Sequence, residues 1–173
     1  MPPVKGLTLT LMAMAAFLIS GCGYHALGTV RGGTDAGGGT IEVSIFANRS
    51  YRPNIEALLT DTIVDELVSR QGKRVVESGG ELHLSGAVLS YGTTAVSYTA
   101  ADAVKEYRAT ITAEMTLRRN DTGRVVWKGT LAATQDYPAN DDLVLQQNSE
   151  DAAIRVICRK LAREAYLHHV EDF

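Results

Sequence analysis

Two short clusters in the sequence carry residue types that could support catalysis. Asp121-Thr122-Gly123 matches the triplet in which aspartic proteases carry a carboxylate, but that chemistry needs two carboxylates sharing one proton in a dry cleft. Here the triplet stands where two predicted strands must be joined, and Asn, Asp and Gly are the residues that turns favour. His83 lies near Ser85 on a predicted strand, without the G-x-S-x-G elbow of a serine hydrolase. We interpret the first cluster as a hairpin turn and expect no enzyme.

A third cluster, at the end of the chain, could suggest a metal site. It combines His168-His169 with Glu171-Asp172. Adjacent helical residues point about 100° apart, whereas a pair of helical ligands lies three or four positions apart. We therefore interpret this segment as a solvated tail, and we expect neither a metal nor another cofactor.

Cys22 is the one residue whose neighbours do indicate covalent chemistry. It follows Leu18-Ile19-Ser20-Gly21, a pattern that resembles the lipobox of bacterial lipoproteins. In that class a diacylglyceryl group is attached to the thiol, the chain is cleaved just before the Cys, and the new amino terminus receives a fatty acid such as palmitate. The alternatives are an ordinary signal peptide with an incidental Cys, or an uncleaved anchor.

The residues before Cys22 fit a secretory signal peptide. Lys5 supplies its positive region, and Leu7 to Ile19 supply an apolar run of thirteen residues, shorter than the roughly 20 that span a bilayer. Two or more acyl chains hold a protein stably at a membrane. Gly23 stands where an Asp would resemble an inner-membrane retention signal, so we expect an anchor in the outer membrane, on its periplasmic side.

Composition indicates one domain behind this anchor. Cleavage before Cys22 leaves 152 of the 173 residues, with 16 basic residues instead of 17 against 20 acidic ones, so the net charge moves from −3 to −4. This balance argues against nucleic-acid binding. With Cys22 acylated, Cys158 has no disulfide partner, and we expect a buried, inert thiol. We assign residues 1–21 to the signal peptide, 22–40 to the lipidated Cys with a Gly-rich tether, and 41–173 to a single α/β domain.

The tether contains the segment Gly28 to Gly39, which has six glycines and no apolar periodicity. A chain of this composition has a root-mean-square reach of about 20 Å. The segment lacks the G-x-G-x-x-G pattern and the Gly-Lys-Ser/Thr sequence of phosphate-binding loops.

The remaining sequence predicts four strands and two helices in the order β-α-β-β-β-α. Period-two alternation marks the strands, and a 3.6-residue apolar period marks the helices. The first helix should begin after Asn54 as N-cap and stop at Gly72, and the last should begin near Ser149, capped by Asn148 or Ser149. The predicted strands cover 41–46, 82–89, 107–117 and 125–134, with a further short strand suggested by Val75-Val76.

These elements predict an α+β fold, a two-layer α/β sandwich with a mixed four-stranded sheet and both helices on one face. A crossover through the first helix should pair the first two strands in parallel, and the others should form an antiparallel meander. We expect Trp127, with Val125 and Leu131, to face the helices. The clearest alternation gives a buried face (Tyr107, Ala109, Ile111, Ala113, Met115 and Leu117) and a wet one (Arg108, Thr110, Thr112, Glu114 and Thr116).

Several short motifs, in order, resemble the LptE family of lipopolysaccharide-assembly lipoproteins. They are Cys22-Gly23-Tyr24-His25-Ala26-Leu27, Phe46-Ala47-Asn48, Glu56-Ala57-Leu58-Leu59-Thr60, Leu82-His83-Leu84-Ser85-Gly86, Tyr107-Arg108-Ala109 and Val125-Val126-Trp127. The resemblance implies a non-enzymatic outer-membrane lipoprotein that plugs the large LptD β-barrel and helps to deliver lipopolysaccharide to the outer leaflet. It also implies possible contact with lipopolysaccharide itself.

Our candidate residues for facing the barrel or lipopolysaccharide are Tyr91, Tyr98, Lys105 and Arg108. We expect a long loop from Tyr91 to Glu106 that orders only against a partner. Unlike many family members, the chain has only Lys105 as a basic residue in this loop, and none in 136–147. The alternative function is a stand-alone lipoprotein that binds an apolar or glycan ligand in a groove lined by Tyr91, Tyr98 and Tyr107; the same rings could equally be strand-end packing.

Overall fold

The computed structural model describes residues 39–70 and 74–171, which form a sheet and two helices. The predicted signal peptide, Cys22, most of the Gly-rich tether and Gly72 lie outside the described residues. The elements are β1 (Thr40–Val43), β2 (Ala47–Asn48), α2 (Ile55–Ser69), β3 (Arg74–Val76), β4 (Leu82–Tyr98), β5 (Val104–Arg119), β6 (Val125–Pro138) and α3 (Leu143–Glu171).

The strands form one mixed sheet with the order β3-β1-β4-β5-β6, and β2 lies beside β4. β1 pairs in parallel with β3 and β4, and the register places Ile41 opposite Leu82. β4, β5 and β6 form an antiparallel meander. The predicted fold class is therefore confirmed, but the predicted strand number of four is wrong. The described sheet has six strands. The two additional strands, β2 and β3, are only two and three residues long, which is too short for a clear alternation in the sequence.

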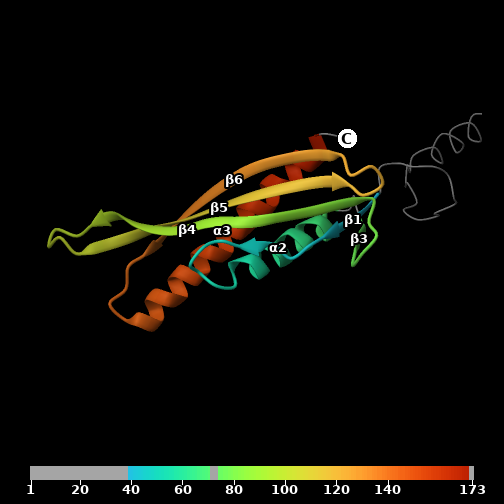
Figure 1. The fold of residues 1–173 in the computed structure, drawn as a ribbon. Coiled ribbons are helices and arrows are strands. Elements are labelled where there is room, and N and C mark those ends of the chain that lie inside the picture. Colours follow the sequence, from blue (N-terminus) through green and yellow to red (C-terminus); the bar gives the residue numbers. More distant parts are fainter. Residues whose placement is uncertain (1–38, 71–73, 172–173) are drawn as a thin grey trace, which may run out of the picture. The chain divides into compact units, whose positions relative to one another are not determined.

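Both helices pack on the same face of the sheet, as the sequence predicted (Figure 1). The odd-numbered residues of β5 from Ala109 to Leu117 are buried in the core beneath them, and the even-numbered residues point to the other face. On α3 the predicted stripe is also buried: Ile154, Ile157, Cys158, Leu161 and Ala165. Burial of these apolar side chains is the main force that holds the two layers together.

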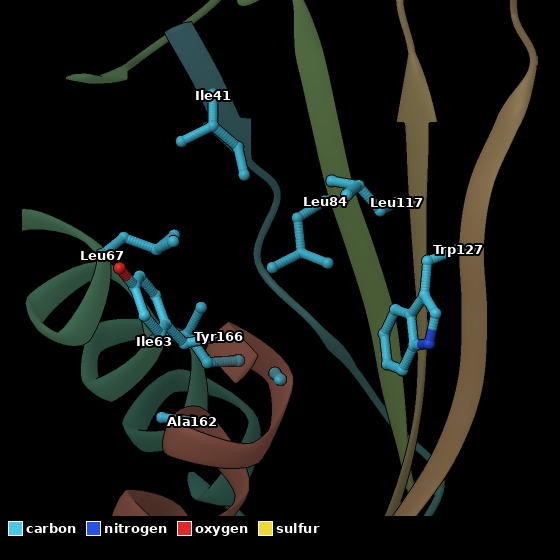
Figure 2. A pocket seen from close by; sticks show the side chains of 9 residues that line it. Ile41, Ile63, Leu67, Leu84, Leu117, Trp127, Ala162 and Tyr166 are labelled. Atoms are coloured by element: carbon cyan, nitrogen blue, oxygen red, sulfur yellow. The ribbon is translucent and has the colours of Figure 1, made fainter. Parts of the chain in front are cut away.

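The two layers enclose a small cavity, shown in Figure 2 between the helices and the strands. Its volume is about 20 Å³, and the side chains that line it come from β1, β4, β5, β6, α2 and α3 and are mainly apolar. A space of this size holds about one water molecule, and apolar walls keep such a cavity dry. The described core is therefore closely packed around this cavity, which is too small for an organic ligand.

The prediction of a long loop from Tyr91 to Glu106 is wrong. β4 continues to Tyr98 and β5 starts at Val104, so most of this segment is paired as an antiparallel hairpin. A register shift between Val88 and Ser90 leaves Leu89 as an extra residue, so that after it the odd-numbered residues face the helices. The bulge interrupts the alternation, and the residues after it are mainly Thr, Ala and Ser. This stretch therefore shows no apolar period in the sequence, although it is paired as a strand.

The last helix also starts earlier than predicted. α3 begins at Leu143 instead of near Ser149, because the Asp142 carboxylate accepts hydrogen bonds from the backbone N–H groups of Val144 and Leu145, at 2.8 and 3.0 Å. Asp142 is thus the N-cap, and neither Asn148 nor Ser149 has that role.

The first strand and the first helix follow the prediction in part. β1 ends at Val43, before the predicted end at Phe46. Asn54 does precede α2, but it is left-handed, with φ of 68°, and its side chain makes no capping hydrogen bond. Phe46 is buried and lies over Gly86, where an added Cβ would come within 2.6 Å of the ring.

The β5–β6 connection is the predicted turn. Gly123 has a positive φ of 68°, and its N–H donates to the Arg119 carbonyl at 2.8 Å. Trp127 does face the helices, where it is half-buried and its ring stacks on His168 at 5.4 Å between centroids. Val125 does not share its environment and is 44% exposed, because a register shift between Leu117 and Arg118 interrupts the alternation.

Candidate partner-binding surfaces

The outer part of the β4–β5 hairpin extends beyond the rest of the sheet, and we call residues 96–106 the arm (Figure 1). β6 ends at Pro138, which is opposite Glu106, so the arm beyond this pair has only two strands. Its turn is closed by hydrogen bonds of its own: the Thr99 N–H donates to the Ala103 carbonyl at 2.8 Å. Within the described residues, no helix contacts the arm closely enough to bury it, and its side chains are exposed or half-buried.

Tyr91 lies just inside the base of the arm and is turned toward the helices. It is 5% exposed, and its hydroxyl donates to the Glu150 carboxylate at 2.6 Å. Burial and this carboxylate raise the pKa of Tyr91, so the hydroxyl stays protonated and continues to donate. The ring also lies 5.7 Å from that of Tyr51. In this structure Tyr91 fixes α3 to the sheet and is not displayed to a partner.

The other candidate residues lie on two different surfaces. Tyr98 is 59% exposed at the outer end of the arm, opposite Val104, and Lys105 is also exposed on the arm. Arg108 lies on the sheet face that the helices do not cover, and two of its nitrogens donate to the Asp136 carboxylate at 2.7 and 2.8 Å. This hydrogen-bonded pair lowers the pKa of Asp136.

The uncovered sheet face is polar along its length. Its side chains include the predicted wet residues of β5 and the residues facing them on β6. Besides Arg108 and Asp136, Lys128 and Glu114 form an ion pair at 2.9 Å. The rest of this face in β5 and β6 is mainly threonine: Thr110, Thr112, Thr116, Thr130 and Thr134. Such a surface offers donors and acceptors to a partner but very little apolar area.

The start of α3 is an exposed apolar segment that was not predicted from the sequence. Leu143, Val144 and Leu145 are 79%, 66% and 55% exposed. An Asp followed directly by an apolar run is a start signal for a helix, so Asp142 could have revealed this segment. A hollow of about 310 Å³ separates it from the arm, and its lining residues come from both sides: Ala103, Val104, Tyr107, Ala139, Asn140, Asp141 and Gln146.

A second open hollow, of about 350 Å³, lies between the start of α2 and the middle of α3. Arg52 and Arg155 are among its lining residues. Arg52 is already paired, at 2.7 Å with Asp151 and 3.7 Å with Glu150. These contacts, together with the Tyr91 hydrogen bond, join the β2–α2 loop, β4 and α3. The charges of this hollow are therefore largely used to hold the domain together.

Two further features bear on function. Among residues 39–70 and 74–171, no group of three or more metal-binding side chains comes together. In the same part of the chain, neither helix has the length and apolar character needed to cross a membrane.

Comparison with solved structures supports the fold. Rare lipoprotein B from Shewanella oneidensis is similar with a TM-score of 0.53 and 14% identity, over 73% of this chain and 93% of that one. The hypothetical protein CT253 from Chlamydia trachomatis gives a TM-score of 0.57 and 12% identity, over 75% and 94%. A Xanthomonas campestris protein, XCC0632, gives 0.54 and 16%, over 75% and 82%. At such low identities these similarities show the fold alone.

The family comparison reaches further than the structural one. None of the curated proteins compared with the chain matches it. The model of the LptE family, described as lipopolysaccharide-assembly, matches residues 39–167, which is almost all of the described structure and well over half of the chain. This confirms the resemblance seen in the sequence motifs. The chain belongs to the LptE family of lipopolysaccharide-assembly lipoproteins, a family without catalytic function.

Proposed function

We propose that this protein is an outer-membrane lipoprotein, anchored by acylated Cys22, that acts as plug and assembly partner of an LptD-like β-barrel and helps to deliver lipopolysaccharide to the outer leaflet. The observation that carries this proposal is the family match over residues 39–167. It covers the whole described sheet, α2 and all of α3 except its last residues, so nearly all of the described structure is shared with the family.

The surface of the domain supports a role inside a barrel. The lumen of an outer-membrane barrel is polar, so most of the surface that a plug presents to it needs hydrogen-bonding groups. The uncovered sheet face has this character, with its threonines and the Arg108–Asp136 and Lys128–Glu114 pairs. These pairs are exposed and contribute little to stability, so they are free to exchange partners on binding.

The interior of the domain gives no support to the alternative of a stand-alone protein that binds an apolar ligand. Such ligand sites enclose about 300 to 1,000 Å³ and are mainly apolar. The enclosed apolar cavity here is about 20 Å³, and the two larger hollows are open. Tyr91, one of the three rings proposed to line a ligand groove, is buried against α3.

Purification tests the proposed partnership. The full-length protein, with an affinity tag at its carboxyl end, is purified from detergent-solubilised outer membrane, and the proteins recovered with it are identified by mass spectrometry. We expect a stable one-to-one complex with an LptD-like barrel. A monomer recovered without the barrel, at normal expression of both, would contradict the proposal.

The anchor has its own test. Cys22→Ala removes the only thiol in the lipobox, so it should leave either the full-length precursor or a form without acyl chains. The mass of the purified wild-type protein should show the acyl chains on Cys22, and Cys158→Ala serves as the control that leaves acylation unchanged. An unmodified Cys22 in the wild type would refute the anchor.

A further inference from the structure

Two groups of apolar side chains are exposed at the same end of the domain. One is on the arm, where Tyr98 is 59% and Val96 is 38% exposed. The other is the first turn of α3, where Leu143, Val144 and Leu145 project into solvent. Exposed large apolar residues in a cluster, unlike single ones, indicate an interaction surface. Val144 and Leu145 cannot turn away from solvent, because Asp142 fixes their backbone N–H groups as the start of the helix.

The two groups belong to one surface. The last β5–β6 pair is Glu106 with Pro138, and the short link 139–142 leads from there directly into α3. The Ala139 N–H donates to the Lys105 carbonyl at 2.9 Å, and the open hollow of about 310 Å³ has walls from both the arm and this link. Figure 1 shows the arm and the start of α3 at the same end, away from β1 and β3.

The charge around this surface is negative. Its carboxylates are Asp102 and Glu106 on the arm and Asp141 and Asp142 before α3, against one cation, Lys105. An apolar surface bordered by carboxylates fits a partner whose apolar patch is bordered by Lys and Arg. It does not fit the phosphates of a lipid, which would meet like charge.

This surface also lies far from the point where the described chain enters the sheet. The described chain enters at β1, where Ile41 pairs with Leu82 at the beginning of β4. Tyr98 is sixteen residues further along β4, which corresponds to about 50 Å at the rise of a strand. The apolar groups thus lie at the far end of the sheet from β1 (Figure 1).

We propose that the outer end of the arm and the first turn of α3 form one docking surface for the protein wall of the barrel. The matching segment of that wall is apolar and bordered by basic side chains. This inference rests on the proposed function, because it assigns a surface to the partner named there. It also gives this end of the domain a protein partner rather than lipopolysaccharide.

The test compares two matched pairs of substitutions in the full-length lipoprotein. Leu143→Ser with Val144→Ser removes apolar area from the proposed surface. Val68→Ser with Leu167→Ser makes the same chemical change at positions that are 60% and 49% exposed near the other ends of the two helices. A third variant, Tyr98→Ser, changes the arm. Barrel recovery is measured at matched expression, and melting of each purified variant shows that it is folded.

We expect the Leu143/Val144 pair and Tyr98→Ser each to reduce barrel recovery about tenfold, because a few central apolar residues carry most of the energy of an interface. The Val68/Leu167 pair should recover the barrel as the wild type does. Equal recovery by all variants would overturn this inference and leave the proposed function intact. So would an equal loss with the control pair, or a loss with only one of the two groups. A wild type that recovers no barrel would overturn the proposed function itself.

The charged border has a separate readout. Asp102→Asn with Asp141→Asn should reduce recovery about threefold at low salt and have little effect at high salt, since salt screens charges at an exposed rim. Improved recovery at low salt would overturn the basic border assigned to the partner.

Discussion

The inner and outer halves of the β4–β5 hairpin are made of the same two strands but have different surroundings. In the inner half, Leu84 pairs with Leu117 and Val88 with Ala113, and all four side chains are buried beneath the helices. In the outer half, the arm continues the same antiparallel pairing through to Tyr98 and Val104 without a helix over it. Both halves are antiparallel, but the arm has register shifts between Ala95 and Ser97 and between Ser97 and Tyr98, and no described helix covers it.

This difference separates folding from function within one hairpin. A two-stranded hairpin alone is marginally stable in water, so the arm depends on the packed half for its structure. Conversely, side chains on the arm contribute little to the core, so they can vary with the needs of partner binding without loss of stability. Substitutions should therefore affect stability in the inner half and assembly in the outer half.

The largest expected effect is on the core side of this comparison. Ile111→Ala removes a fully buried side chain of β5 and should lower the free energy of unfolding by about 2 to 5 kcal/mol. Val96→Ala on the arm should change it by less than about 0.5 kcal/mol. Denaturant titration of both variants measures the difference. Similar losses in both would show that the arm is part of the cooperative core.

Two glycines of β4 give a matched pair with a smaller effect. An added Cβ at Gly86 would lie 2.5 Å from the Glu114 carbonyl and 2.6 Å from the Phe46 ring, whereas at Gly92 it would meet nothing within 4 Å. Gly86→Ala should therefore cost about 1 to 3 kcal/mol through overpacking, and Gly92→Ala should be neutral or slightly stabilising. Thermal melting of the two variants tests this, and equal melting temperatures would contradict the close packing of Phe46 on β4.

The mildest effect concerns the Cys158 thiol in the packed half. Burial raises its pKa from 9.0 to about 12. The folded state therefore holds the thiol proton more tightly than the unfolded state does. The protonated thiol contributes its full share to the free energy of unfolding below pH 9, and this share is lost as the pH rises from 9 toward 12. At pH 8 a thiol reagent should modify Cys158 only after denaturation. Rapid modification of the native protein would show that α3 opens from the sheet.

The exposed end can be tested by the same logic. Tyr98→Ser should leave the melting temperature within about 2 °C of the wild type, although it weakens barrel recovery, because an exposed side chain contributes little to folding. A marked loss of stability would mean that Tyr98 contributes to folding, as the side chains of the inner half do.

The sequence alone determined the features that depend on local patterns. The alternation from Tyr107 to Leu117 identified both faces of β5, because each residue of a half-covered strand sees either core or solvent. The stripe from Ile154 to Ala165 identified the buried side of α3 in the same way. The Asn120–Gly123 turn and the ordered motifs from Phe46 to Trp127 also needed no tertiary information, and the motifs identified the family.

Tertiary structure decided the features for which the local pattern fails. The arm has solvent on both faces, so its strands carry no alternating pattern, and the bulge at Leu89 reverses the faces just before it. That reversal turned Tyr91 inward to Glu150, which no spacing rule could show. The arm and the start of α3 lie at the same end of the domain because β6 ends at Pro138 and a short link returns the chain to α3. An interaction surface assembled from segments some 45 residues apart exists only once the sheet has brought them to one end.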